Sequence, residues 1–177
     1  MTVSAAKKYG LHVDGDKSMM SVQGGTVEGA DGNATGVMCQ NEGRVEMAEV
    51  ALARCLGVVV SGKGSRAVIE RGSIKEAGQN SGVFCQYGAS AELDSVTISD
   101  CRCGVSLFHM GSSVKITGGA ILGCVEDGVH LAKDTAAELR RVTVLRCGRH
   151  GMHCVGGQLI EEGCNLSECA QGSVFKR

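Results

Sequence analysis

One four-residue pattern, a glycine followed by an apolar residue, any residue and a second apolar residue, recurs along the whole sequence and constrains the fold more than any other feature. Successive glycines of the pattern are 21 to 26 residues apart, with a mean spacing of about 23. A fixed period of this length is typical of solenoid proteins, in which each repeat is one structural unit that stacks on the next. The glycines that open the pattern are Gly10, Gly36, Gly57, Gly82, Gly104, Gly128, Gly151 and Gly172.

Three further columns of residues keep step with the glycines. The first is apolar and contains Val22, Met47, Ile69, Leu93, Ile116 and Leu139. Five residues after each member comes a second apolar column, Val27, Leu52, Ile74, Ile98, Ile121 and Val144. Three residues later comes a column of small residues, Ala30, Cys55, Ala77, Cys101, Cys124 and Cys147. Each repeat therefore holds three short segments in which apolar and polar residues alternate, and this alternation predicts strands with one buried face.

Other repeat folds fit this period less well. A leucine-rich repeat has a helical half, and no repeat here shows the spacing of an amphipathic helix. A propeller blade needs about 40 residues. The sequence therefore predicts an all-β parallel β-helix of about seven coils, each of about 23 residues and three short strands. We expect a single domain over residues 1–177, with residues 1–9 as a short N-terminal cap or edge segment.

The ten cysteines are predicted to be free thiols rather than ligands or disulfides. Ala30 and Ala77 share a column with Cys55, Cys101, Cys124, Cys147 and, in the seventh repeat, Cys169, which indicates that the position selects small volume and not thiol chemistry. The first ten residues contain no apolar stretch typical of a secretory signal. We therefore expect a cytoplasmic or other reducing intracellular location.

The stretch from Ser90 to Gly157, which includes SSVKITGGAILGCVEDGVHL, resembles the right-handed β-helix repeats of the pectate-lyase-like superfamily. It is most similar to the repeats of carbohydrate-binding and sugar-hydrolase proteins and to the β-helix domains of F-box ubiquitin-ligase adaptors. The resemblance implies a right-handed parallel β-helix. For function it implies either polysaccharide lyases, hydrolases and epimerases or non-catalytic binding domains.

The outward positions of the glycine strands test the enzyme alternative. Two residues after each glycine stand His12, Met38, Val59, Phe84, Ser106, His130, His153 and Val174. Four residues after each glycine stand Asp14, Gln40, Ser61, Gln86, Phe108, Ala132, Val155 and Lys176. Only Asp14 is acidic and none is arginine, whereas glycoside cleavage needs a pair of carboxylates. We predict no catalytic residue on this face. Elsewhere, Glu76 and Asp100 on adjacent repeats are the remaining catalytic candidates, although paired surface charges explain them better.

Asp127, His130, His150 and His153 fall at equivalent places of two adjacent repeats. Imidazole and carboxylate groups at this spacing are able to hold a zinc or copper ion. A polar surface at a strand edge is the alternative, and we favour it because a metal site also needs supporting partners that a sequence does not show. No metal and no other cofactor is therefore predicted.

The favoured function is a non-catalytic protein-interaction or structural β-helix that belongs to a larger assembly. Met38, Val59 and Phe84 form an outward apolar row, and contiguous apolar surface is typical of interfaces. We expect a protein partner or self-association through this face or through an end of the β-helix. The alternative is a carbohydrate-binding or carbohydrate-active module. The predicted binding surface comprises Met38, Gln40, Val59, Phe84, Gln86, Phe108, His130 and His153.

Two classes of partner are not expected. The net charge of −1 argues against nucleic acid, whose phosphates need a basic surface. No apolar run approaches the roughly 20 residues of a membrane-spanning helix, so membrane insertion is not predicted either.

Overall fold

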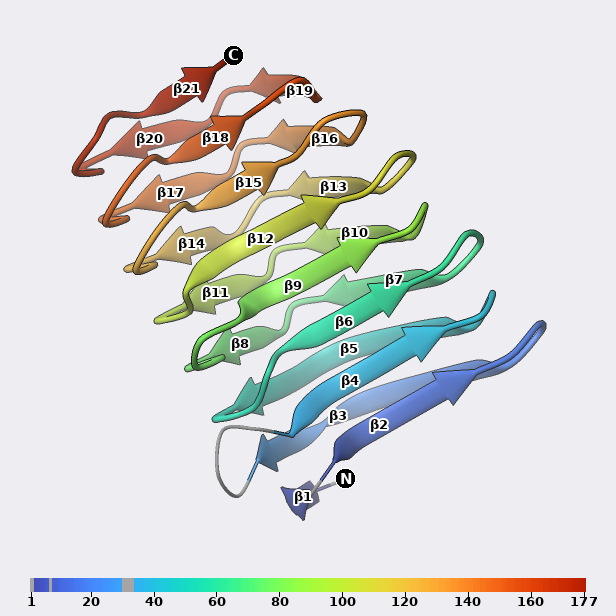
Figure 1. Cartoon of the computed structure of the whole chain (residues 1–177). Coiled ribbons are helices and arrows are strands. Elements are labelled where there is room, and N and C mark those ends of the chain that lie inside the picture. The colour runs from blue at the N-terminus through green and yellow to red at the C-terminus, as the bar shows by residue number, and fades with distance from the viewer. Residues whose placement is uncertain (1, 7, 30–33) are drawn as a thin grey trace.

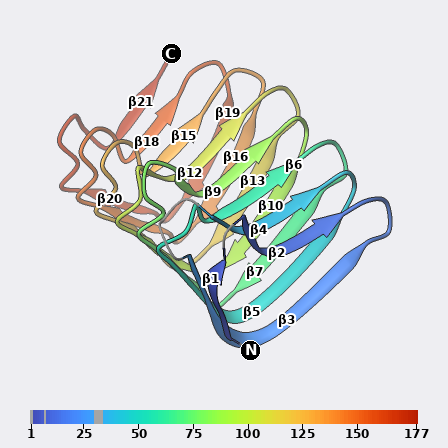
Figure 2. The same cartoon turned by 60° about the horizontal axis from the view of Figure 1, so that its bottom comes forward.

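The computed structural model describes residues 2–6, 8–29 and 34–177, and over these residues the chain winds into a stack of coils (Figure 1). All strand pairs are parallel, and each strand pairs with the equivalent strands of the coils before and after it. The two ends of the chain lie at opposite ends of the stack, and the two sheets form opposite walls of the coils (Figures 1 and 2). The predicted all-β parallel β-helix of about seven coils is confirmed. The described part of the chain contains no helix that could cross a bilayer.

One wall is a sheet of eight strands within the described residues, and each of its strands carries one glycine repeat. These strands are β2 (Tyr9–Asp14), β4 (Thr35–Gln40), β6 (Val58–Ser61), β9 (Ser81–Gln86), β12 (Cys103–Phe108), β15 (Val129–Leu131), β18 (Met152–Cys154) and β21 (Val174–Lys176). We call this wall the glycine sheet.

The other wall is a sheet of thirteen strands within the same residues. Its first two coils contribute β3 (Met19–Gly29) and β5 (Arg44–Ala53), and β1 (Thr2–Ala6) pairs with β3 at the edge. The first strands of the later coils are β7 (Arg66–Glu70), β10 (Ser90–Asp94), β13 (Ser113–Thr117), β16 (Ala136–Arg140) and β19 (Gln158–Glu162). The second strands are β8 (Ser73–Lys75), β11 (Thr97–Ser99), β14 (Ala120–Leu122), β17 (Thr143–Leu145) and β20 (Asn165–Ser167).

The prediction of three strands per coil holds from the third coil onward, whereas the first two coils have two. In the later coils a residue with positive φ, such as Arg71 or Ser95, separates the two short strands. Gly24 and Glu49 have the same positive φ inside β3 and β5. Pairing resumes directly beyond them, between Gly25 and Val50, so each strand continues through the bend.

The predicted columns match the strand register, and their side chains fill the space between the two walls. Met47, Ile69 and Leu93 face one another through β5, β7 and β10, and all three are buried. The cysteine column from Cys55 to Cys147 is buried as well. Its predicted first member, Ala30, lies outside the described residues, as do residues 1 and 7 of the predicted cap.

The last repeat departs from the prediction by one residue. Val174 pairs with Met152 and Phe175 with His153, so Phe175 and not Val174 occupies the outward position after His153. Accordingly Ser173 and not Gly172 is the partner of Gly151, whose missing Cβ would lie 2.6 Å from the Ser173 carbonyl oxygen. The glycine pattern does not apply here because the chain follows the register of hydrogen bonds, and these place a serine at this position.

Close approach between coils explains the glycine column. A Cβ on Gly104 or Gly128 would lie 2.5 Å from the carbonyl oxygen of the glycine in the next coil. Real side chains do not approach a backbone oxygen so closely, and only glycine leaves the space empty. The cysteine sulfurs pack beside these positions, with Cys124 Sγ 3.5 Å from the Cβ position of Gly104. Small residues in both columns therefore let the coils approach each other.

This packing predicts that most thiols are unreactive in the native protein. Eight cysteines are buried, and only Cys164 and Cys169 are partly exposed. Burial raises the pKa of Cys85 to about 12 and that of Cys101 to about 11, which suppresses the reactive thiolate. A disulfide reagent should modify at most two thiols in native buffer and all ten in denaturant. Rapid labelling of a third thiol in native buffer would contradict this prediction.

Candidate functional site

The outer face of the glycine sheet carries one ladder of side chains that runs the length of the stack. Its members are His12, Met38, Val59, Phe84, Ser106, His130, His153 and Phe175. Most side chains of the ladder are half-buried, as expected for side chains that stand side by side on the outer face of a sheet, and Ser106 is buried. The half-buried members include Met38, Val59, Phe84, His130 and His153. The structure thus brings the predicted apolar row and the two histidines onto one face.

The remaining predicted surface residues lie on a parallel ladder two positions further along the strands. Gln40 Nε2 donates a hydrogen bond to Asp14 Oδ2 at 3.0 Å, and Gln86 Nε2 donates one to Ser61 Oγ at 3.4 Å. Phe108, with 36% of its surface exposed, continues this ladder after Gln86. Its ring contacts two members of the first ladder, one in the coil before and one in the coil after, with centroid distances of 5.6 Å to Phe84 and 5.3 Å to His130.

A groove of about 360 Å³ runs beside these rings. The glycine sheet contributes Phe84, Ser106, Phe108 and His130 to its lining. The connecting loops contribute Gln79, Asn80, Arg102, Glu126 and Arg149. The buried hydroxyls of Ser81 and Ser106 hydrogen-bond each other at 2.7 Å on the same side of the sheet. The groove therefore combines aromatic rings with amide, hydroxyl and charged groups.

The charged wall of the groove was not predicted, because it lies at a loop position, two residues before each glycine, that belongs to none of the predicted columns. Arg102, Glu126 and Arg149 lie on successive coils, linked by backbone hydrogen bonds from each amide to the preceding carbonyl. The Arg102 guanidinium pairs with Glu126 at 3.1 Å. All three stand two residues before a glycine of the repeat, so they form a further column of the sequence that marks this wall. The groove thus has two arginines and a carboxylate that the strand positions alone do not supply.

Two exposed apolar side chains lie at the ends of β9 and β12 opposite the loops that line the groove. Tyr87 and Met110 are 55% and 75% exposed at the turns that follow β9 and β12. The Tyr87 ring stacks on His109 of the next coil with centroids 3.9 Å apart. We call Phe84, Tyr87, Phe108 and Met110 of these two adjacent coils the aromatic patch: the rings of Phe84 and Phe108 contact each other, and Tyr87 and Met110 stand on the turns that follow their strands.

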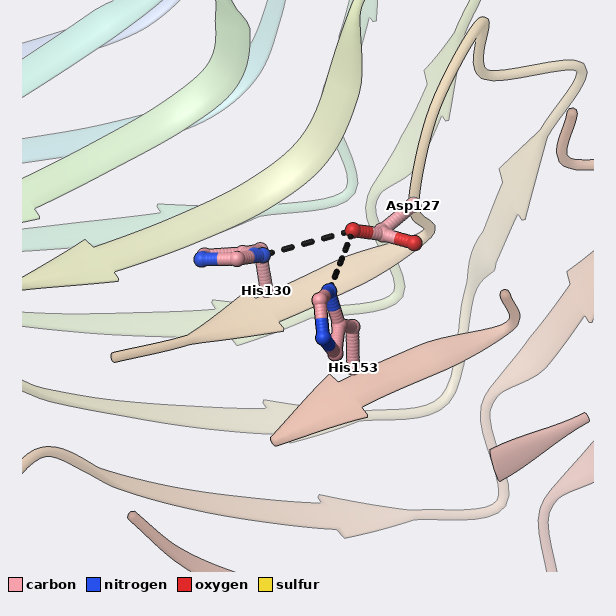
Figure 3. A group of neighbouring side chains, drawn as sticks. All are labelled: Asp127, His130 and His153. Carbon is pink, nitrogen blue, oxygen red and sulfur yellow. Dashed lines mark hydrogen bonds and ion pairs between the residues drawn. The ribbon is translucent and has the colours of Figure 1, made fainter. Parts of the chain in front are cut away.

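The four histidine and aspartate residues predicted to lie close together do so, around one buried carboxylate. Figure 3 shows three of them, Asp127, His130 and His153. Asp127 Oδ2 lies 3.3 Å from His130 Nδ1 and 3.0 Å from His153 Nδ1. Its other oxygen, Oδ1, accepts the His150 backbone N–H at 3.1 Å and lies 3.2 Å from His150 Nδ1. β15 and β18 hold His130 and His153 at paired positions, which fixes the spacing of the two rings.

These contacts determine the charge state of Asp127. Burial raises the pKa of this carboxyl, but hydrogen bonds from His130, from the His150 amide and from His153 outweigh it, so the pKa is held well below its usual range. The carboxylate is therefore ionised at neutral pH. A buried anion among imidazoles can orient those rings or bind a cation.

The other catalytic candidates lie away from this region. Glu76 and Asp100 are exposed on adjacent coils, each with positive φ at the corner that precedes the cysteine column. Neither lines the groove. The structure therefore does not bring this pair together with the aromatic rings or the histidines.

Comparison with known proteins identifies the family but not an activity. The family model described as a right handed beta helix region matches residues 9–166. No match was found among the curated proteins.

Proposed function

Because the chain belongs to the right-handed β-helix family, we propose that it is a non-catalytic binding protein whose aromatic patch and neighbouring groove receive a protein partner. The family supplies a rigid stack of coils, and the function of such a stack depends on the side chains that it displays. The aromatic patch is the observation that carries the proposal.

The composition and position of the aromatic patch are typical of protein interfaces. Tyrosine, phenylalanine, methionine and arginine are enriched at such interfaces. The sequence has only five Phe and Tyr residues, and three of them lie in this patch. Exposed aromatic rings supported by neighbouring rings are well suited to act as anchors, because they lose little conformational freedom on binding.

The groove indicates the chemistry of the partner. Arg102 is neutralised by Glu126, whereas Arg149 adds a further positive charge to the lining. We therefore expect a peptide segment that presents apolar or aromatic side chains next to an acidic residue.

The carboxylates near the groove support a binding role over catalysis. Glu126 is the sole carboxylate in the groove lining, and Arg102 pairs with it. Asp127 is buried, and both of its oxygens have partners. Glycoside hydrolysis usually requires two free carboxylates, one on either side of the sugar bond, and this lining does not contain them.

Selection of peptides from a random display library tests the proposal. We expect peptides with aromatic and acidic residues that bind the wild-type protein saturably in calorimetry. The double variant Tyr87→Ser/Met110→Ser should weaken their binding at least about tenfold, because it removes two exposed anchors. Met19→Ser is the matched control, since Met19 is 59% exposed on the thirteen-stranded sheet. Failure to obtain a saturable peptide, or equal binding by the double variant, would refute the proposal.

A carbohydrate ligand is the second candidate, and the mixed lining of the groove favours it. Aromatic rings beside amide, hydroxyl and guanidinium groups suit a ring-shaped polar ligand. In the same calorimeter, neutral and acidic oligosaccharides are titrated into the wild-type protein and into Arg149→Ala. The ligand would be a carbohydrate, and not a protein, if an acidic oligosaccharide bound the wild type saturably, if Arg149→Ala lost this binding, and if no peptide bound.

A further inference from the structure

The cluster around Asp127 has the donor atoms and the spacing of a metal centre. Asp127, His130 and His153 each offer one ligand atom, and these three atoms all lie within 4.8 Å of one another (Figure 3). The two nitrogen–oxygen distances are 3.0 and 3.3 Å. Ligand atoms bonded to zinc at 2.0–2.1 Å are roughly 3.3 Å apart in a tetrahedron, so both distances match a coordination sphere.

We propose that Asp127, His130 and His153 form a binding site for a divalent transition-metal ion of the zinc class. Two imidazoles and one carboxylate select such ions over magnesium and calcium, which prefer oxygen ligands alone. The ion would also neutralise a carboxylate that is buried in the protein. This site adjoins the aromatic patch, because His130 lines the groove and Phe108 stacks on it, but the proposal does not depend on the proposed partner.

The structure supplies the supporting contacts that the sequence does not show. Asp127 Oδ1 is held by the backbone N–H and the ring of His150, which leaves Oδ2 directed at the two ligand histidines. Carboxylate ligands in metal centres are commonly hydrogen-bonded by neighbouring groups in this way, and these hydrogen bonds fix the orientation of the carboxylate. The backbone part of the contact is independent of side-chain identity, so sequence columns give no sign of it.

Aromatic rings pack against the histidines on both sides of the cluster. Phe108 stacks on His130, and Phe175 meets His153 edge-on with centroids 4.9 Å apart. An apolar shell of this kind holds the rings in place and limits solvent access. The His130 and His153 side chains still retain 22% and 13% exposure, so an ion can enter from solvent.

Zinc titration of the full chain, freed of metal with a chelator, tests the site. We expect one zinc per chain by calorimetry and by elemental analysis, and no binding of magnesium or calcium. His130→Asn and His153→Asn should each weaken zinc binding at least about 100-fold, and His150→Asn about tenfold, since it acts through Asp127. His12→Asn is the matched control, because His12 occupies the same ladder in the first coil. It should bind zinc as the wild type does.

Cobalt distinguishes this site from binding by cysteines. Cobalt held by nitrogen and oxygen lacks the intense thiolate charge-transfer absorption that cysteine ligands produce. We expect no such absorption in the cobalt protein. Absence of stoichiometric zinc, full zinc affinity in folded His153→Asn, or a thiolate band would each overturn the proposal. None of these results bears on peptide or oligosaccharide binding, which is measured without metal.

Discussion

Replacing Gly104 with alanine is expected to lower the free energy of unfolding by about 3 kcal/mol, a large part of the roughly 5–15 kcal/mol that stabilises a typical domain. The added Cβ would lie 2.3 Å from Ile121 Cγ2 and 2.5 Å from the Gly128 carbonyl oxygen. The isoleucine methyl can move slightly, but the carbonyl belongs to the next coil and is fixed by the ladder of strand pairs. The clash therefore forces two coils apart in the middle of the stack.

Gly118→Ser separates this clash from the general cost of removing a glycine. Gly118 has a φ of 63°, but a Cβ there would meet Ser95 only at ordinary contact distance. Its equivalents Ser95 and Arg141 have side chains at similar φ. Gly118→Ser should therefore cost only about 1–2 kcal/mol. Urea unfolding followed by circular dichroism measures both variants. An equal loss in the two would show that coil contact does not account for the glycine column.

The stacking of coils explains why so much of the fold could be predicted from the sequence. When equivalent residues lie directly above one another, one column of the sequence corresponds to one column in space. Ile74, Ile98 and Ile121 illustrate this, since all three pair in the predicted register and are buried. The same logic correctly grouped His130 with His153, which β15 and β18 place opposite each other.

The prediction was incomplete where contacts involve loops or backbone atoms. Arg102, Glu126 and Arg149 line the groove from turns, where side-chain direction does not alternate as it does in a strand. The bond from the His150 amide to Asp127 depends on the turn conformation before β18. In the last coil Glu161 takes the position opposite Leu139, and Ile160 is 61% exposed. Strand pairing there overrides the apolar pattern.

Asp127→Ala is expected to destabilise the protein by about 3 kcal/mol at pH 7, because it removes a buried charged acceptor that holds four donors. The His150 backbone N–H is left without a partner, and three imidazoles lose theirs. Asp127→Asn should recover most of this loss. Its amide oxygen can accept the His150 N–H, and its NH₂ group can hydrogen-bond the rings of His130 and His153. Urea unfolding of the three proteins gives the comparison.

The pH dependence identifies the carboxylate as the source of this stability. The pKa of Asp127 is lowered in the folded protein from the ordinary value of 3.8. A carboxyl with a lowered pKa stabilises the folded state above its unfolded pKa, and the gain disappears as pH falls through the folded value. The difference between wild type and Asp127→Ala should therefore persist at neutral pH and shrink steadily below about pH 4. A difference that stays constant down to pH 2 would mean that the cavity left by alanine, and not the lost charge, destabilises the variant.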